Sequence, residues 1–215
     1  MQIRLLIFCM LIVSASWCQS NTDNKNIVFQ GFSGGMMLHA GYMFGQDKHA
    51  PVSSDGQLCS PQGAAFGIGG CLRVHLWKHF RTGFEGGVST MNSNTTDCRN
   101  VLKQGSFIRT GYGGVLADAY WKIKKTWLYI GGSTGGGSVN GLYILDGDRN
   151  SWEQDANSTF HKQSFFYINP YFGCDYCLTD KVHLTFRCDW MLSIHHSELL
   201  LPTGPRIYFG FMFCH

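Results

Sequence analysis

The clearest pattern in the chain is an alternation of apolar and polar residues over 182–190. Valine, leucine, phenylalanine, cysteine and tryptophan occupy the even positions, whereas histidine, threonine, arginine and aspartate occupy the odd ones. A period of two places the two sets on opposite faces of a β-strand. One face is hydrocarbon and the other can carry ions. The direction in which each face points therefore decides between a barrel in a membrane and a barrel in water.

Similar segments, rich in glycine and aromatic residues, recur along the chain and predict an all-β fold with eight strands. The connections between them are alternately long and short, which in an up-and-down barrel gathers four long loops at one end and three short turns at the other. Outer-membrane barrels have this arrangement, with short periplasmic turns and longer extracellular loops, whereas a soluble barrel such as a lipocalin has no reason to sort its loops. The predicted strands are 27–44, 64–76, 80–91, 105–121, 126–145, 164–177, 182–190 and 206–214.

The placement of lysine favours the membrane barrel. All nine lysines after residue 20 fall in the N-terminal linker, the turns, the long loops or the strand ends. A soluble barrel uses lysine in mid-strand to solvate its outer face, but at the centre of a bilayer a lipid-facing lysine costs roughly 2–4 kcal/mol. The apolar face is therefore expected to point outward into lipid.

The other ionisable residues within the strands fall almost wholly on one parity, so we expect them to point inward. Arg109 is the exception, and it lies near the loop end of its strand. An eight-stranded barrel has an interior just wide enough for side chains to fill, and buried charges must be paired. The sequence thus predicts a closed ionic network in the lumen, made of His39, Arg73, His75, Arg81, Glu85, Asp118, Asp175, His183, Arg187 and Asp189.

Large aromatic residues near the strand ends are expected to form the two girdles that outer-membrane barrels place at the membrane interfaces. The expected members are Phe44, Trp77, Phe80, Trp121, Trp127, Tyr167 and Trp190.

The first twenty residues are typical of a secretory signal, with Arg4 before an apolar core over 5–13 and small residues up to Ser20. We therefore expect a signal peptide at 1–20, a short linker at 21–25 and the outer-membrane barrel at 26–215. The formal net charge of +3 is small and spread along the chain, so nucleic acid is not an expected partner.

Seven cysteines remain after the predicted signal, and an odd number argues against a complete disulfide framework. Cys59 and Cys98 lie in two different long loops and could pair there. Cys174 and Cys177 form a CxxC pattern, but residues three apart on a strand face opposite ways, which argues against metal or redox chemistry. No metal or other cofactor is expected, although His161 with His195 and His196 offers an alternative loop metal site.

At this point the chain resembles the small eight-stranded outer-membrane barrels of the OmpA/OmpX type. The resemblance covers residues from about 26 to the end and includes the aromatic-rich last strand over 207–213. It implies a monomer in contact with outer-membrane lipid and lipopolysaccharide, located in the bacterial outer membrane and inserted by the barrel-assembly machinery. The glycine-rich phrase over 31–39 also looks like outer-membrane proteins of Bacteroides-like bacteria. The extracellular partner is not specified.

A second resemblance concerns the loop end of the seventh strand. His195 and Ser197 match the His-x-Ser motif of outer-membrane lipid A deacylases, which implies a histidine base and a serine nucleophile. The family's asparagine is replaced by Glu198, the remaining candidate acid, and Arg206 stands near the family's acid position. Our main hypothesis is a structural or surface-interaction barrel without catalysis. The alternatives are a deacylase-like hydrolase using His195, Ser197 and Glu198, and a soluble ligand-binding barrel.

Overall fold

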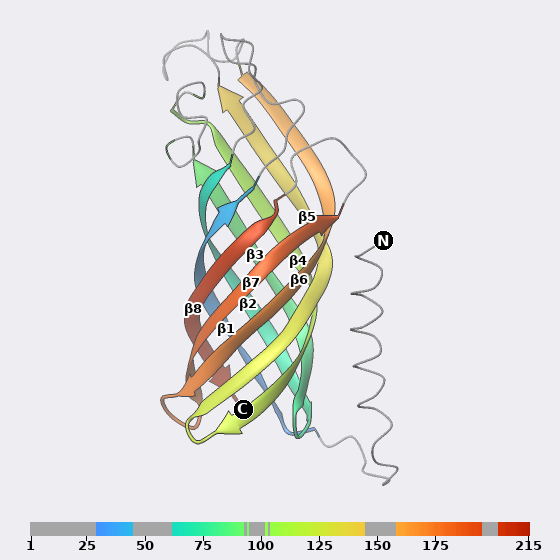
Figure 1. The fold of residues 1–215 in the computed structure, drawn as a ribbon, viewed down its shortest axis with the longest axis vertical. Helices are drawn as coiled ribbons and strands as arrows, with labels where there is room; N and C mark the ends of the chain where they lie inside the picture. Colours follow the sequence, from blue (N-terminus) through green and yellow to red (C-terminus); the bar gives the residue numbers. More distant parts are fainter. Residues whose placement is uncertain are drawn as a thin grey trace.

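The computed structural model describes residues 29–44, 62–92, 94, 102, 104–144, 158–194 and 202–215. These residues form a closed antiparallel barrel of eight strands in sequence order (Figure 1), which confirms the predicted fold class. Among them, no helix is long and apolar enough to cross a membrane. The strands are β1 Gly31–Met43, β2 Gly63–Trp77, β3 Phe80–Asn92, β4 Phe107–Ile123, β5 Thr126–Ile144, β6 Ser158–Cys177, β7 Val182–Ile194 and β8 Gly204–Cys214.

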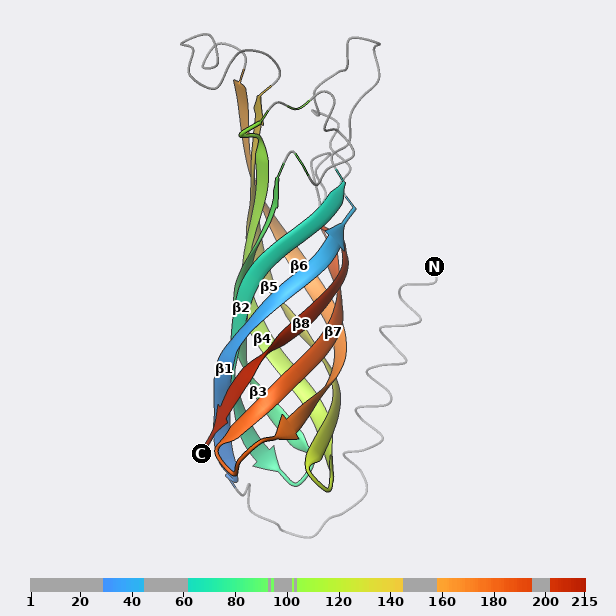
Figure 2. The ribbon, with the colours of Figure 1, turned by 90° about the vertical axis from the view of Figure 1, so that its left-hand side faces the viewer.

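Closure of the barrel depends on the pairing of its first and last strands. β1 pairs with β8 from Ser33 opposite Cys214 to Gly41 opposite Arg206, and Figure 2 shows the two strands side by side. Each described strand thus has a hydrogen-bonded neighbour on both sides. This satisfies the backbone groups that lipid cannot hydrate.

The strand bounds differ most from the prediction at β6, which begins at Ser158 and not at residue 164. The polar segment 158–163 was assigned to a loop, but it pairs with the end of β5, Ile144 lying opposite Ser158. β5 and β6 together form the longest hairpin and extend past the other strands at the loop end (Figure 2). Beyond the membrane, a strand no longer needs apolar residues on its outer face, so the alternation that marks a strand is weakest there.

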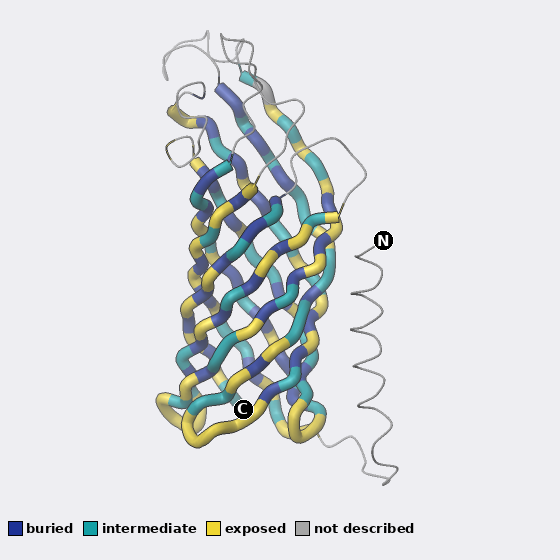
Figure 3. Tube along the Cα trace, viewed as in Figure 1, coloured by how far each residue is buried: buried dark blue, intermediate teal, exposed yellow. Residues whose placement is uncertain are grey.

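The two faces of the strands point as the alternation predicts. Phe84 is 65% exposed and Phe172 61% on the outside, whereas Arg73 and Arg187 inside are 0% and 1% exposed. Buried and exposed residues alternate along the strands in Figure 3. A barrel with hydrocarbon outside and ions inside is the arrangement that spans a lipid bilayer.

Two of the expected girdle residues are wrongly placed by the sequence analysis. Tyr167 is fully buried in the lumen, and Trp127 packs against lumen residues between His75 and His183. Both have inward parity, since Trp127 lies two residues from the buried Tyr129 and Tyr167 two residues from the buried Asn169. An aromatic residue fits either face, so composition alone does not assign it.

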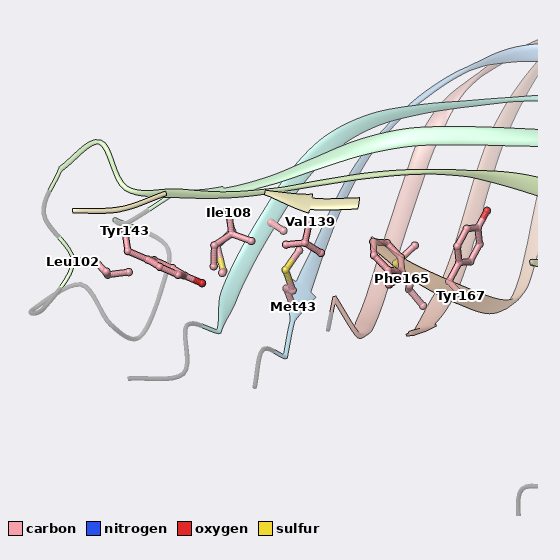
Figure 4. Close-up of a cluster of buried hydrophobic side chains, with 10 residues drawn as sticks. Met43, Leu102, Ile108, Val139, Tyr143, Phe165 and Tyr167 are labelled. Atoms are coloured by element: carbon pink, nitrogen blue, oxygen red, sulfur yellow. The ribbon is translucent and has the colours of Figure 1, made fainter. Parts of the chain in front are cut away.

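Apolar side chains close the loop end of the lumen. Met43, Met91, Met191, Ile108 and Phe165 belong to one buried cluster, which is drawn in Figure 4. A second cluster, around Met37, Met212 and several tyrosines, lies nearer the turns. The charged residues of the lumen lie between the first cluster and the turns, among the rings of the second cluster, away from bulk water.

Glycines form a continuous row on the outer face. Gly70 lies opposite Gly86, Gly86 opposite Gly113, and Gly113 opposite Gly136, so the row crosses β2, β3, β4 and β5. A Cβ added at Gly136 would come no closer than 3.8 Å to another atom. The inward Gly135 beside it is different, because an added Cβ would lie 2.2 Å from the Gly113 carbonyl oxygen.

Alanine at Gly135 should therefore destabilise the folded barrel by about 1–3 kcal/mol through overpacking. Alanine at Gly136 is the matched control and should leave stability unchanged or raise it by up to about 1 kcal/mol, because only the freedom of the unfolded chain is reduced. The measurement is the urea midpoint for folding into lipid vesicles. Equal loss of stability in the two variants would contradict the assignment of Gly135 to the lumen face and Gly136 to the lipid face of β5.

Candidate functional site

The ten ionisable residues predicted for the lumen are all buried in the barrel interior. They come from β1, β2, β3, β4, β6 and β7, and each has the inward parity of its strand. They do not form a single network. The charged residues separate into two clusters along the barrel axis, and the histidines lie beside them.

The cluster nearer the turns holds two arginines between two aspartates. Arg81 donates from Nε to Asp118 at 2.6 Å and from a terminal nitrogen to Asp175 at 3.0 Å. Arg73 lies 3.5 Å from Asp118 and 3.7 Å from Asp175. Thr185 donates to the second oxygen of Asp175 at 2.6 Å. Each carboxylate therefore bridges both guanidinium groups.

Arg73 is the more loosely held of these two cations. None of its side-chain nitrogens forms a hydrogen bond with a described residue. Its guanidinium carbon lies 4.7 Å from the centre of the Tyr129 ring. Two carboxylates and a ring face therefore balance its charge without direct hydrogen bonds.

The cluster nearer the loops centres on Asp189. Arg206 donates to its two oxygens at 2.9 and 3.0 Å, and Arg187 donates to it at 3.0 Å. Arg187 also donates to Glu85 at 2.6 Å. Asn169 donates to Asp189 at 2.8 Å. This is a bidentate pair extended into a network, the strongest form of charged hydrogen bond in proteins.

Arg206 was missed as a lumen residue by the sequence analysis, which considered it only beside the deacylase motif. Its parity was available as a signal, because Arg206, Tyr208 and Met212 share one face of β8 and all are buried. With Arg206 included, the described lumen holds four arginines and four carboxylates in salt bridges. The buried core is therefore electrically balanced.

Tyrosines, which the sequence analysis also missed, fill the space between the charges. The Arg187 guanidinium carbon lies 3.9 Å from the centre of the Tyr171 ring, and that of Arg206 lies 4.7 Å from Tyr112. The hydroxyls of Tyr112 and Tyr208 lie 2.8 Å apart. Arginine against an aromatic face is favourable when water is excluded, so these rings both pack the lumen and stabilise its cations.

The three predicted lumen histidines form no salt bridge with a carboxylate among the described residues. His39 bonds to the Ser89 hydroxyl at 2.6 Å, and His75 bonds to the Ser33 hydroxyl at 3.1 Å. His183 lies edge-on to Trp127 and 3.4 Å from the Cys214 sulfur. These contacts suit neutral imidazoles that complete the packing at the two ends of the ionic core.

The catalytic alternative and the predicted disulfide fall outside the described residues. This holds for His195, Ser197 and Glu198 and for Cys59 and Cys98. The β7 and β8 segments that lead to the 195–201 loop are tied together, since the Ser193 hydroxyl donates to the carbonyl oxygen of Pro202. Within the described ranges, no group of three histidine, cysteine or acidic residues is arranged to hold a metal ion.

Comparison with known proteins identifies the fold and not the family. No protein-family model matches the chain, and no curated protein does. Among solved structures, the outer-membrane protein OprG from Pseudomonas aeruginosa matches 85% of this chain and 96% of its own with a TM-score of 0.50 at 11% identity. Ail of Yersinia pestis, in complex with the heparin analogue sucrose octasulfate, covers 86% and 99% with a TM-score of 0.48 at 10% identity. Neisserial surface protein A covers 86% and 95% with a TM-score of 0.47 at 12% identity.

The chain thus has the fold of bacterial outer-membrane barrels.

Replacing Arg187 by glutamine should destabilise the barrel by about 3–5 kcal/mol, because Glu85 and Asp189 would lose a buried partner. The matched control is Arg109→Gln, which removes the same charge from the exposed face of β4 and should change stability by less than about 0.5 kcal/mol. Both values come from urea unfolding of the vesicle-inserted protein. Similar small losses in the two variants would show that Arg187 is not a buried ion-pair partner.

Proposed function

We propose that the protein is a non-enzymatic barrel of the bacterial outer membrane that displays its long loops to a surface partner. The observation that carries the proposal is the lumen itself. Its charged groups are paired with one another, tyrosine rings fill the space between them, and methionine and aromatic side chains pack its loop end. A barrel whose lumen is filled in this way is a rigid scaffold and not a channel for ions or small molecules.

The arrangement of the connections supports an interaction role. The three short turns join β2 to β3, β4 to β5 and β6 to β7, and the four longer connections leave the opposite end. Loops carried on a rigid scaffold are the usual place for binding in such folds. Outer-membrane lipid and lipopolysaccharide are the surroundings of the apolar band, the barrel-assembly machinery inserts the chain, and the protein acts as a monomer.

The membrane location predicts where and how the expressed protein is found. It should appear in the outer-membrane fraction and migrate differently on a gel before and after boiling, because a closed barrel resists detergent until heated. In planar bilayers the inserted protein should give no stable conductance steps, since salt bridges and rings fill its lumen. Recovery in the soluble fraction without a gel shift would overturn the membrane location, and steady open-channel currents would overturn the sealed lumen.

The absence of catalysis has its own test. Lipid A extracted from cells that express the wild-type chain should have the same mass spectrum as lipid A from cells with an empty vector. A Ser197→Ala variant provides the control for the deacylase alternative. Loss of an acyl chain with the wild type, but not with this variant, would replace the proposed role with a hydrolase.

A further inference from the structure

The outer face of the described strands carries two charged side chains, Arg109 on β4 and Lys162 on β6. Both residues are exposed. Arg109 has the parity of the exposed Val115 on its strand, and Lys162 has the parity of the exposed Phe172. Every carboxylate within the described strands has the opposite, inward parity and is buried. An otherwise apolar face thus carries positive charge at one place.

The two cations lie in one row across the barrel wall. Arg109 is directly opposite Asn140 of β5, and Asn140 is directly opposite Lys162. Because neighbouring strands are about 4.8 Å apart, the Cα atoms of the two cationic residues are about 10 Å apart. Their long side chains can therefore reach one group that lies over Asn140. The salt bridges among the described residues include neither cation.

The row lies at the height of lipid headgroups. Arg109 is twelve residues from the exposed Trp121, which lies near the turn end of β4. At about 3.3 Å per residue and a strand tilt of about 40°, this is roughly 30 Å along the membrane normal, slightly more than the apolar band of about 25 Å. With the long loops outside the cell, the two cations face the headgroups of the outer leaflet.

Hydroxyl groups lie beside the cations. Ser138 of β5 and Ser164 of β6 are directly opposite each other, one outward row closer to the turns. Both have the outward parity of their strands, and neither is buried. Together with the Asn140 amide they provide hydrogen-bond donors between and below the two charges. Such a group of cations and neutral donors suits an anion with several acceptor oxygens.

The same row continues into an apolar depression. Gly111 is directly opposite Ser138, and a Cβ added at Gly111 would have no atom within 4 Å. Gly111 lines a depression of about 510 Å³ on the outer face, together with the exposed Ile68 and Val88. The depression therefore begins one outward row below Arg109. A ligand with its charge on Arg109 could lay a hydrocarbon chain there.

We propose that Arg109 and Lys162 bind the phosphate of an outer-leaflet lipid, one acyl chain of which lies in the depression beside Gly111. The proposal rests on the membrane location and orientation proposed above. A phosphate is an anion with several acceptor oxygens, and charge-assisted hydrogen bonds to arginine and lysine are its usual contacts. A phosphorylated glycolipid such as lipid A combines that headgroup with acyl chains. A soluble phosphate ester would leave the depression unused.

The test uses the full chain folded in dodecyl maltoside, a neutral detergent. Diphosphoryl lipid A is titrated, and native mass spectrometry gives the number of bound lipids and their affinity. The wild type should bind one lipid A saturably. Arg109→Gln and Lys162→Gln should each weaken that binding by roughly fivefold, because each removes one cation from the contact with the headgroup.

Lys125→Gln is the matched control for charge. It removes a lysine from the turn at the opposite end of the barrel and should weaken binding by less than about twofold, because a charge so far away is screened. The heat-dependent gel shift of each variant shows that its barrel is folded. Since Arg109 has no ion-pair partner among the described residues, its replacement should lower lipid binding without lowering stability in vesicles free of lipid A.

A second arm separates the phosphate from the acyl chain. Diglucosyl diacylglycerol, which has acyl chains and no phosphate, should bind far more weakly than lipid A. Gly111→Leu fills the depression and should weaken lipid A binding several-fold, whereas Ala117→Leu, on the same face of β4 nearer the turns, should not.

The site is overturned if lipid A does not bind saturably, if the phosphate-free lipid binds as tightly, or if Lys125→Gln weakens binding as much as Arg109→Gln. Equal binding by the Gly111→Leu and Ala117→Leu variants would overturn the placement of the acyl chain. A wild-type chain that reaches the outer membrane with a sealed lumen but binds no lipid A would contradict this site and leave the scaffold role intact.

Discussion

Eight charged side chains can occupy the narrow interior of this barrel because every guanidinium group lies within reach of a carboxylate. Removing an ion from water costs several kcal/mol, and only close partners with good geometry recover that cost. Asp189 accepts from both Arg187 and Arg206, and Asp118 and Asp175 each lie between Arg73 and Arg81. These partners come from different strands, so the pairing requires that all strands keep their register. The outer apolar face alone would permit a slip of two residues, but the charges do not.

The two ends of the barrel are built differently, and this difference separates their roles. At the loop end, methionine and aromatic side chains pack above Arg206 and His39 and cover the ionic core. At the turn end, an open cavity is lined by aromatic residues together with Lys122, Asp180 and Lys181. The loop end thus offers a firm base for long loops, whereas the turn end opens into a cavity. The ionic core between the two ends fixes the strand register, and so fixes the position of one end relative to the other.

The fold could be predicted from the sequence because a barrel wall imposes a period of two on every strand. The inward direction of Arg187 and Asp189 and the outward direction of Trp190 follow from that period alone. The pairing partners do not, because they depend on registers between strands far apart in the sequence; Glu85 and Arg187, for example, are 102 positions apart. Trp127 was misassigned because an aromatic ring suits both lipid and a packed lumen. The start of β6 was missed because a strand in water shows no apolar face.

The row of outward glycines has a consequence for the electrical insulation of the core. Side chains elsewhere on the wall add a layer of hydrocarbon between lipid and the lumen, but along Gly70, Gly86, Gly113 and Gly136 that layer is missing. A surface depression beside Gly70 and Gly86 includes Tyr112 in its lining, and the ring of Tyr112 lies 4.7 Å from the guanidinium carbon of Arg206. The acyl chains of the bilayer are therefore separated from a buried cation by one sheet of backbone and one phenol ring. The membrane's low dielectric comes closest to the ion pairs there, and lipid composition becomes part of their electrostatic environment.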